Sequence, residues 1–363
     1  MTDRNVLSAD SHVIEPPEMW REYVESSMRD RAPHLEHGKD NDWYCIEGLK
    51  PMDVTVLSSA GTPSEELKTW RRWDAPGRLK GGWVPGIRRK DIEADGVDGE
   101  VLYATIGMKM LPLADMDYKR ACFRGYNRWL ADFCKSDPKR YVGIAVLTTD
   151  DIDAAVKDLR EAKSLGLGGA LLGMTPGENI TYASPEFDPL WKVAQELHMP
   201  LSLHNFTQNE SKVVRSRFEV FASAPVDVQY SISSMIFGDV FERFPELKLV
   251  SVENDIGWAA NFLYRMDHVF HRYSVLLNKT FKSGRLPSEV FRDHVYLTFM
   301  DDPAGIRTYD LIGVDNVMWA NDYPHGDSTW PNSKEAISRQ FDTMPAADRQ
   351  KILRDNVIKL YDW

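Results

Sequence analysis

Carboxylate and imidazole side chains recur at several points of the chain, each directly after a short run of apolar, β-favouring residues. They are Asp10 and His12, His204, Glu253, and Asp322 followed three residues later by His325. Neutral imidazoles and carboxylates together suit zinc, manganese or iron(II), and three or four such ligands leave a position open for water or substrate. The residue types therefore predict a catalytic divalent metal centre rather than a closed structural one.

The spacing of these residues favours one shared site. Asp10 and His12 lie two residues apart, so both side chains point to the same face of an extended segment. A single histidine at the end of a strand is usually a hydrogen-bonded core residue, whereas several ligand-type residues at matching strand ends favour a metal site. We expect the metal to be held by Asp10, His12, His204 and Asp322.

Eight short apolar runs, separated by segments with helical periodicity, are the elements that would position these residues. The strands are predicted at Asn5–Asp10, Gly99–Ala104, Val142–Leu147, Gly169–Gly173, Leu201–Asn205, Lys248–Asn254, Val295–Met300 and Asn316–Asp322. This alternation is typical of an α/β fold in which βα units close into a TIM-like (β/α)8 barrel. Active sites of such barrels lie at the carboxyl ends of the strands, where the ligand-type residues stand.

The segment 21–90 interrupts this alternation. It is rich in charges, ends in a Gly/Pro-rich run at 81–86, and holds four tryptophans: Trp43, Trp70, Trp73 and Trp83. We interpret it as an insertion after the first strand, within a single barrel domain that spans residues 1–363. Its composition fits a lid over the barrel mouth, and it fits packing or a subunit contact equally well.

The composition narrows the range of partners. The 363 residues are 43% hydrophobic and carry a formal net charge of -11, which indicates a globular chain with little attraction to nucleic acid or anionic membranes. A small-molecule substrate is expected. The first residues lack the apolar run of a signal peptide, and no window reaches the length of about 18 apolar residues that a transmembrane helix needs. A cytoplasmic location is therefore expected.

Other reactive residues are given structural roles. Cys45, Cys122 and Cys134 form no CxxC pair and are interpreted as free thiols without disulfide or metal roles. Glu15 is expected to be a solvated turn residue, with support of the first-strand loop as the alternative. The remaining histidines are expected to be structural or solvent-facing: His34, His37, His198, His268, His271 and His294. The chain has no Walker loop, GxSxG elbow or HExxH motif.

Three segments together carry a resemblance to a known family: Ser8–Pro16, Leu203–Asn205 and Trp319–His325. They resemble the amidohydrolase family that includes aminocarboxymuconate-semialdehyde decarboxylase, over nearly the whole barrel outside the insertion. The resemblance implies a metal-dependent enzyme in which His204 is the strand-five ligand. It implies that Asp322 binds the metal and can take a proton from metal-bound water. It also implies a closed homo-oligomer, here a homodimer or homotetramer.

The chain departs from the family pattern at two positions. The first-strand motif is commonly His-x-His, whereas Asp10 stands at the first position here. Zinc is the first expectation for the site, with one or two ions bound, but a carboxylate ligand strengthens the case for manganese or iron. The second departure follows strand six, where the decarboxylase relatives usually carry a histidine and this chain has Glu253.

Glu253 determines the reaction that we expect. A carboxylate beside a cation stays ionised, so Glu253 is expected to be a metal ligand or a general base, or else to fix a ligand histidine. Such a site favours a metal-activated water that attacks a small organic acid, amide or ester-like substrate, with Glu253 or Asp322 managing the proton. His325 is expected to hydrogen-bond a substrate carboxylate or oxyanion, with a helix-capping or loop histidine as the alternative. The sequence therefore predicts a hydrolase.

Three alternatives are kept open. The family resemblance implies non-oxidative decarboxylation of an aromatic or unsaturated acid, in which a residue delivers a proton to carbon. A second metal held by Glu253, Asp322 and His325 would indicate a di-iron oxygenase on the same barrel. A metal-free binding barrel is disfavoured, because polar groups at strand ends are costly to bury without a ligand.

Overall fold

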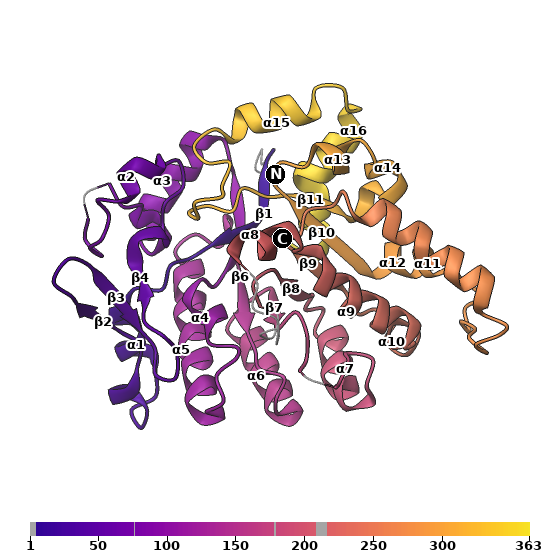
Figure 1. Cartoon of the computed structure of the whole chain (residues 1–363), viewed down its shortest axis with the longest axis horizontal. Helices are drawn as coiled ribbons and strands as arrows, with labels where there is room; N and C mark the ends of the chain where they lie inside the picture. The colour runs from indigo at the N-terminus through magenta and orange to yellow at the C-terminus, as the bar shows by residue number, and fades with distance from the viewer. Residues whose placement is uncertain (1–4, 76, 178, 208–215) are drawn as a thin grey trace.

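The computed structural model describes residues 5–75, 77–177, 179–207 and 216–363. Eight parallel strands form one sheet whose spatial order follows the chain (Figure 1). They are β1 (Leu7–His12), β5 (Gly99–Tyr103), β6 (Tyr141–Val146), β7 (Gly169–Leu172), β8 (Leu201–His204), β9 (Leu249–Val252), β10 (Val295–Phe299) and β11 (Val317–Trp319). Every predicted strand is present, with ends shifted by a few residues, and the predicted (β/α)8 barrel is confirmed.

The sheet closes between its first and last strands through the residues that follow β11. The backbone N–H of Asp322 donates to the carbonyl of Asp10 at 3.0 Å, and the N–H of His12 donates to the carbonyl of Tyr323 at 2.7 Å. The pairing of β1 with β5 shifts register between Ser8 and Ser11. These bonds bring the two ends of the barrel sequence, and the ligand-type residues on them, side by side.

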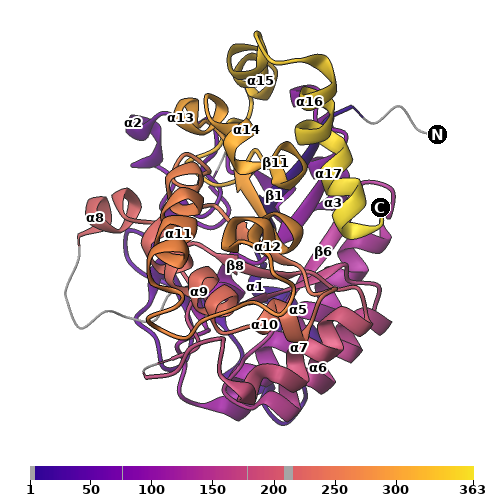
Figure 2. The ribbon, with the colours of Figure 1, turned by 90° about the vertical axis from the view of Figure 1, so that its right-hand side faces the viewer.

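Helices surround the strands, as Figures 1 and 2 show. Most begin at a recognisable signal: the carboxylates of Asp115 and Asp151 cap their helices by accepting from backbone N–H groups, and proline opens several others. The longer helices are α3 (Pro85–Asp95), α5 (Met116–Lys135), α6 (Ile152–Ser164), α7 (Asp188–Glu196), α9 (Pro225–Phe237), α11 (Ala259–Tyr273), α12 (Pro287–His294), α15 (Ser333–Phe341) and α17 (Asn356–Tyr361). Their buried apolar faces and the strands form one continuous core.

The segment between β1 and α3 contains its own small sheet. It holds α1 (Pro17–Tyr23), the antiparallel strands β2 (His34–His37), β3 (Asp42–Cys45) and β4 (Met52–Asp53), and α2 (Ser64–Leu67). The N–H of Ala60 donates to the carbonyl of Pro324 at 3.1 Å, and the N–H of Ile14 donates to that of Gly82 at 2.8 Å. The segment thus packs against the loops after β1 and β11, while its role as a lid stays a prediction.

A buried ion pair braces the same two loops. The guanidinium of Arg88, on α3, donates to both carboxylate oxygens of Glu100 at 2.6 and 2.9 Å, and both side chains are fully buried. Arg88 also donates to the carbonyls of His12 at 2.7 Å and Tyr323 at 3.4 Å. Because each charge is paired and hydrogen-bonded, the pair tolerates burial and fixes the backbone on both sides of the barrel seam.

The surface has two features that bear on partners. Among the described residues, none of the helices combines the length and apolarity needed to cross a bilayer. Apolar side chains are exposed after α11, where Val275, Leu276 and Leu277 lie on the surface. The homodimer or homotetramer expected from the family resemblance stays a prediction.

Candidate active site

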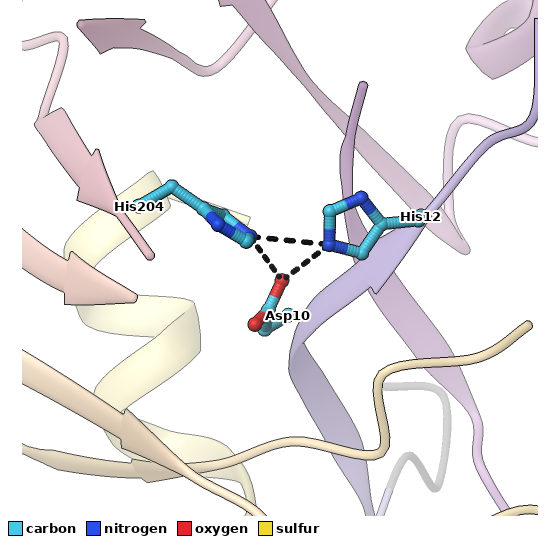
Figure 3. A group of neighbouring side chains, drawn as sticks. All are labelled: Asp10, His12 and His204. Carbon is cyan, nitrogen blue, oxygen red and sulfur yellow. Dashed lines mark hydrogen bonds and ion pairs between the residues drawn. The ribbon is translucent and has the colours of Figure 1, made fainter. Parts of the chain in front are cut away.

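Asp10, His12 and His204 converge at the carboxyl ends of β1 and β8 (Figure 3). The Nε2 atoms of the two histidines lie 3.1 Å apart. Oδ1 of Asp10 lies 3.5 Å from each of these nitrogens. All three side chains are buried. The shared face predicted from the two-residue spacing of Asp10 and His12 is therefore present, and a residue about 190 positions away completes the group.

The hydrogen bonds on the far sides of the two imidazoles fix their tautomers. Nδ1 of His12 lies 2.8 Å from the carbonyl oxygen of Ala104, and Nδ1 of His204 lies 2.9 Å from that of Asn205. Since a carbonyl only accepts, each Nδ1 carries the proton and each Nε2 presents a lone pair to the centre. This is the orientation that a metal-binding histidine adopts.

Asp322 joins the group from the loop after β11. Its Oδ1 lies 3.3 Å from Nε2 of His12. Oδ1 of Asp10 and Oδ1 of Asp322 are both buried without a hydrogen-bond partner. Two facing lone pairs and two unpartnered carboxylate oxygens would be unfavourable by themselves, and a divalent cation at their centre would satisfy all four. The residues present therefore fit the predicted metal centre.

The charges of the site also fit a cation. Burial and the negative charge of Asp10 raise the pKa of Asp322 well above its usual range. Burial also raises the pKa of Asp10, but the attraction of His204 and His12 outweighs burial and leaves that pKa below its usual value. Two such carboxylates resist being ionised together, and a divalent ion between them removes this conflict.

His325 contacts Asp322 rather than standing free in the pocket. Its Nδ1 lies 3.1 and 3.2 Å from the two carboxylate oxygens of Asp322, and its Nε2 lies 2.9 Å from the hydroxyl of Thr105. Burial lowers the pKa of His325 to about 3, so the ring is neutral. With both nitrogens engaged, His325 holds the Asp322 carboxylate in place, and the expected bond to a substrate oxyanion would require one of these contacts to open.

Glu253 lies apart from the four ligand-type residues. Its Oε2 is 3.4 Å from Nδ1 of His204, on the side of the ring that faces away from Asp10. Among the described residues, no group of possible metal ligands includes Glu253. Burial and the charge of Asp322 raise its pKa well above the usual range. The structure thus places Glu253 behind the ligand histidine.

A cavity of about 510 Å³ opens beside the centre, and both Asp10 and Glu253 line it. Its lining mixes polar residues, among them Asn205, Asp255 and Thr298, with aromatic ones. The aromatic residues are Phe218 and Phe221 from α8 (Arg217–Ala222) and Phe299 from β10. A concave pocket that combines aromatic side chains with convergent polar groups is a common form of small-molecule site.

Three residues at strand ends have left-handed backbone conformations, with φ of 57° at Glu253, 52° at Asp255 and 54° at Asp322. Such conformations are unfavourable for residues with a side chain and persist where the surroundings enforce them. They turn the chain sharply after β9 and β11, so that Glu253 and Asp255 line the cavity and Asp322 faces His12.

Glu15 is buried, which corrects the expectation of a solvated turn residue. Its carboxylate accepts from the backbone N–H groups of Thr105, Ile106 and Gly107 at 3.3, 2.8 and 2.9 Å, at the start of α4 (Ile106–Lys109). The same loop supplies the carbonyl of Ala104 to His12 and the hydroxyl of Thr105 to His325. The alternative, support of the loop around the first strand, describes its position better.

Replacing Glu15 with glutamine is expected to lower the free energy of unfolding by about 1–3 kcal/mol, because an amide N–H₂ group would face backbone donors. Urea denaturation measures this change. The matched control is Glu18→Gln, at an exposed position of α1, which should leave the midpoint unchanged. Equal midpoints for both variants would show that Glu15 does not hold the loop.

Comparisons with known proteins agree with this site. The profile of the family described as Amidohydrolase matches residues 46–363. The chain belongs to the amidohydrolase family. It is 26% identical over 308 residues to a gamma-resorcylate decarboxylase from Rhizobium radiobacter, a match that covers 77% of this chain and 87% of the relative.

Solved structures resemble this amidohydrolase along its whole length. An amidohydrolase from Mycobacterium avium subsp. paratuberculosis superposes with a TM-score of 0.79 at 18% identity, covering 99% of this chain and 98% of the other. A dihydroxybenzoic acid decarboxylase from Polaromonas sp. JS666, with bound manganese and 2-nitroresorcinol, gives a TM-score of 0.66 at 17% identity, covering 99% and 97%. At these identities the structures establish the shared barrel.

The relatives overturn the predicted hydrolysis. The sequence relatives of this amidohydrolase include decarboxylases that match it over most of their length, so the hydrolase prediction is wrong and its alternative is favoured. The physical reason lies in Glu253, which the prediction required to be an ionised base at the metal. It stands instead on the outer side of His204, in surroundings that favour its protonated form.

Sequence reasoning missed two supporting residues. Thr105 and Arg88 act only through contacts with residues far away in the chain, at His325 and at the carbonyls of His12 and Tyr323. Neither stands in a motif. A signal for Arg88 is its spacing of four residues from Ile92, which places both on one face of a helix, since an arginine on a buried face needs an acidic partner.

Proposed function

We propose that this chain is a metal-dependent, non-oxidative decarboxylase of an aromatic carboxylic acid. The observation that carries the proposal is a buried cluster in which His12 is shared by two groups of possible metal ligands, one with Asp10 and His204 and the other with Asp322 and His325. Two carboxylate oxygens of this cluster have no hydrogen-bond partner, and a cavity opens beside it. The match to gamma-resorcylate decarboxylase over 87% of that relative supports the reaction class.

Manganese is the ion that we propose for this centre. Two of the four ligand-type residues are carboxylates, whose hard oxygen atoms suit manganese. Thiolate ligands, which favour zinc, are not among the four. The manganese in the Polaromonas decarboxylase is consistent with this choice. When bound, the ion would hold oxygens of the substrate and offset negative charge that develops during the reaction.

The reaction replaces a carboxylate on carbon by a proton and releases carbon dioxide. The C–C bond to the carboxylate breaks, its electron pair stays on the ring carbon, and a proton from the protein forms the new C–H bond. Glu253 is the residue that we assign to deliver this proton. It lines the same cavity as Asp10, lies outside the metal ligands, and burial raises its pKa so that it retains a proton.

The other residues around the centre position the ligand-type side chains and shape the cavity for the substrate. His325 and Thr105 hold Asp322, and the carbonyl of Ala104 holds the ring of His12, so that the reacting groups do not reorganise. The phenyl rings that line the cavity provide flat apolar surface for an aromatic substrate.

The proposal is tested by incubating the metal-loaded protein with 2,6-dihydroxybenzoate and 5-carboxyvanillate, and measuring carbon dioxide in the headspace. We expect release from at least one hydroxylated benzoate, loss of release after the metal is removed by a chelator, and recovery when manganese is restored. The methyl esters of the same acids are the control. Ester hydrolysis without carbon dioxide release from any of the free acids would contradict the proposal.

A further inference from the structure

A second group of ligand-type side chains lies on the β2–β3 hairpin, at the left of Figure 1 and outside the barrel centre. His34 and Cys45 are directly opposite each other in the antiparallel pair. Glu36 stands two residues after His34 on the same strand and therefore on the same face. The backbone pairing alone brings an imidazole, a thiol and a carboxylate together.

The side chains complete this arrangement. Nε2 of His34 lies 3.7 Å from Oε1 of Glu36, and the ligand atoms of His34, Glu36 and Cys45 all lie within 4.8 Å of one another. Tetrahedral zinc, with bonds of about 2.0–2.3 Å, needs ligand atoms roughly 3.3–3.8 Å apart. Only small side-chain rotations would therefore bring the three atoms onto one ion.

The tautomer of His34 also suits metal binding. Its Nδ1 lies 3.1 Å from the carbonyl oxygen of Ala32, so Nδ1 carries the proton and the lone pair of Nε2 faces Glu36. A hydrogen bond from Nδ1 to a backbone carbonyl orients His12 in the barrel in the same way. On the same hairpin, His37 differs: its Nδ1 contacts the carboxylate of Asp42 at 2.8 Å, and within the part of the chain that the structure describes it belongs to no group of possible metal ligands.

We propose that His34, Glu36 and Cys45 form a separate site for a zinc-type divalent cation, with a fourth position open to water. A thiolate, an imidazole and a carboxylate together favour zinc over the harder manganese that we assign to the barrel. Binding deprotonates the Cys45 thiol, so that a sulfur–metal bond forms and one proton is released to solvent. In the structure Cys45 is a free thiol and His34 is exposed, as expected from the sequence, and the proposal assigns an ion to these two groups and Glu36.

The position of the site gives it a structural consequence. Cys45 follows Tyr44, whose hydroxyl donates to the backbone carbonyl of Glu15 at 2.8 Å and accepts from the indole N–H of Trp20 at 2.5 Å. An ion between β2 and β3 would fasten the edge strand of the small sheet next to this buried contact. Bound zinc should therefore raise the unfolding temperature of the chain.

Cobalt titration followed by absorption spectroscopy tests the site independently of catalysis. A thiolate–cobalt bond produces a charge-transfer band in the near ultraviolet, and the barrel ligands contain no sulfur. Among the described residues, neither of the other two cysteines belongs to a ligand group, so the band reports the hairpin alone. We expect one equivalent of cobalt beyond that held by the barrel centre to produce the band, and zinc to displace it.

The variants decide whether these three residues bind the ion. Cys45→Ser should abolish the band, and His34→Ala should weaken binding by about 100-fold or more, beyond the 10–100-fold typical of residues that only support a ligand. His34 is exposed, so this variant keeps the fold, and His37→Ala is the matched control that should bind normally. Absence of the band in the wild type, or equal loss in His34→Ala and His37→Ala, would overturn the proposal.

Discussion

Replacing His204 with alanine is expected to remove the barrel metal and to lower kcat/KM by about 10³-fold or more, since a lost metal forfeits several kcal/mol of charge stabilisation. The barrel should stay folded, because the one backbone group that the ring contacts is the carbonyl of the adjacent Asn205, and removal of the ring leaves Asp10 and His12 in place. Elemental analysis of protein purified without chelator, together with circular dichroism, measures metal content and fold in the same sample.

The same loss is expected for His12→Ala, whose Nε2 lies 3.1 Å from that of His204. The matched control is His268→Ala, at an exposed position of α11 outside every group of possible ligands, which should retain metal and activity. Folded His204→Ala and His12→Ala proteins with unchanged metal content would show that the two histidines are core residues and that the centre lies elsewhere.

Replacing Glu253 with glutamine is expected to lower kcat by about 10²–10⁴-fold, the range for lost general acid–base catalysis. Metal content should stay unchanged, because the Glu253 carboxylate faces the outer side of His204. Since the pKa of Glu253 is raised, the wild-type rate should fall as pH rises through that pKa, where the acid loses its proton. The variant has no such proton to lose, so its residual rate should lack this decline.

Asp255→Asn is the control for Glu253→Gln. Asp255 also lines the cavity and shares the left-handed backbone conformation, and burial raises its pKa to about 6. It is placed two residues beyond Glu253, and we assign it no part in proton delivery. If both variants lose activity equally, the loss of a carboxyl group from this loop explains the effect, and proton delivery by Glu253 does not. Full decarboxylation by Glu253→Gln would show that another group supplies the proton.

The barrel and the convergence of its ligand-type residues were predictable because they follow from local patterns. Eight apolar runs with intervening helical periodicity predict the strands, and the carboxyl ends of parallel strands must meet at one edge. His204 and Asp322 therefore could be placed together with Asp10 without any knowledge of their contacts. Strand ends shifted by a few residues, as with β1, since sequence patterns mark the middle of a strand better than its limits.

The orientation of individual side chains was not predictable in the same way. Glu253 follows β9 in a left-handed turn with φ of 57°, and its carboxylate lies at the Nδ1 side of His204. The burial of Glu15 depends on three N–H groups about 90 residues away. Neither property has a local signature. The hydrolase prediction failed because it depended on the first of these orientations.

The fate of solvent hydrogen in the product is the measurement that tests the central claim most directly. In deuterium oxide, decarboxylation through proton delivery to carbon predicts one deuterium at the carbon that lost the carboxylate. It also predicts one carbon dioxide for each product molecule, and both signals should disappear when the metal is removed. Product that carries oxygen from the solvent water and forms without carbon dioxide would contradict decarboxylation and indicate hydrolysis.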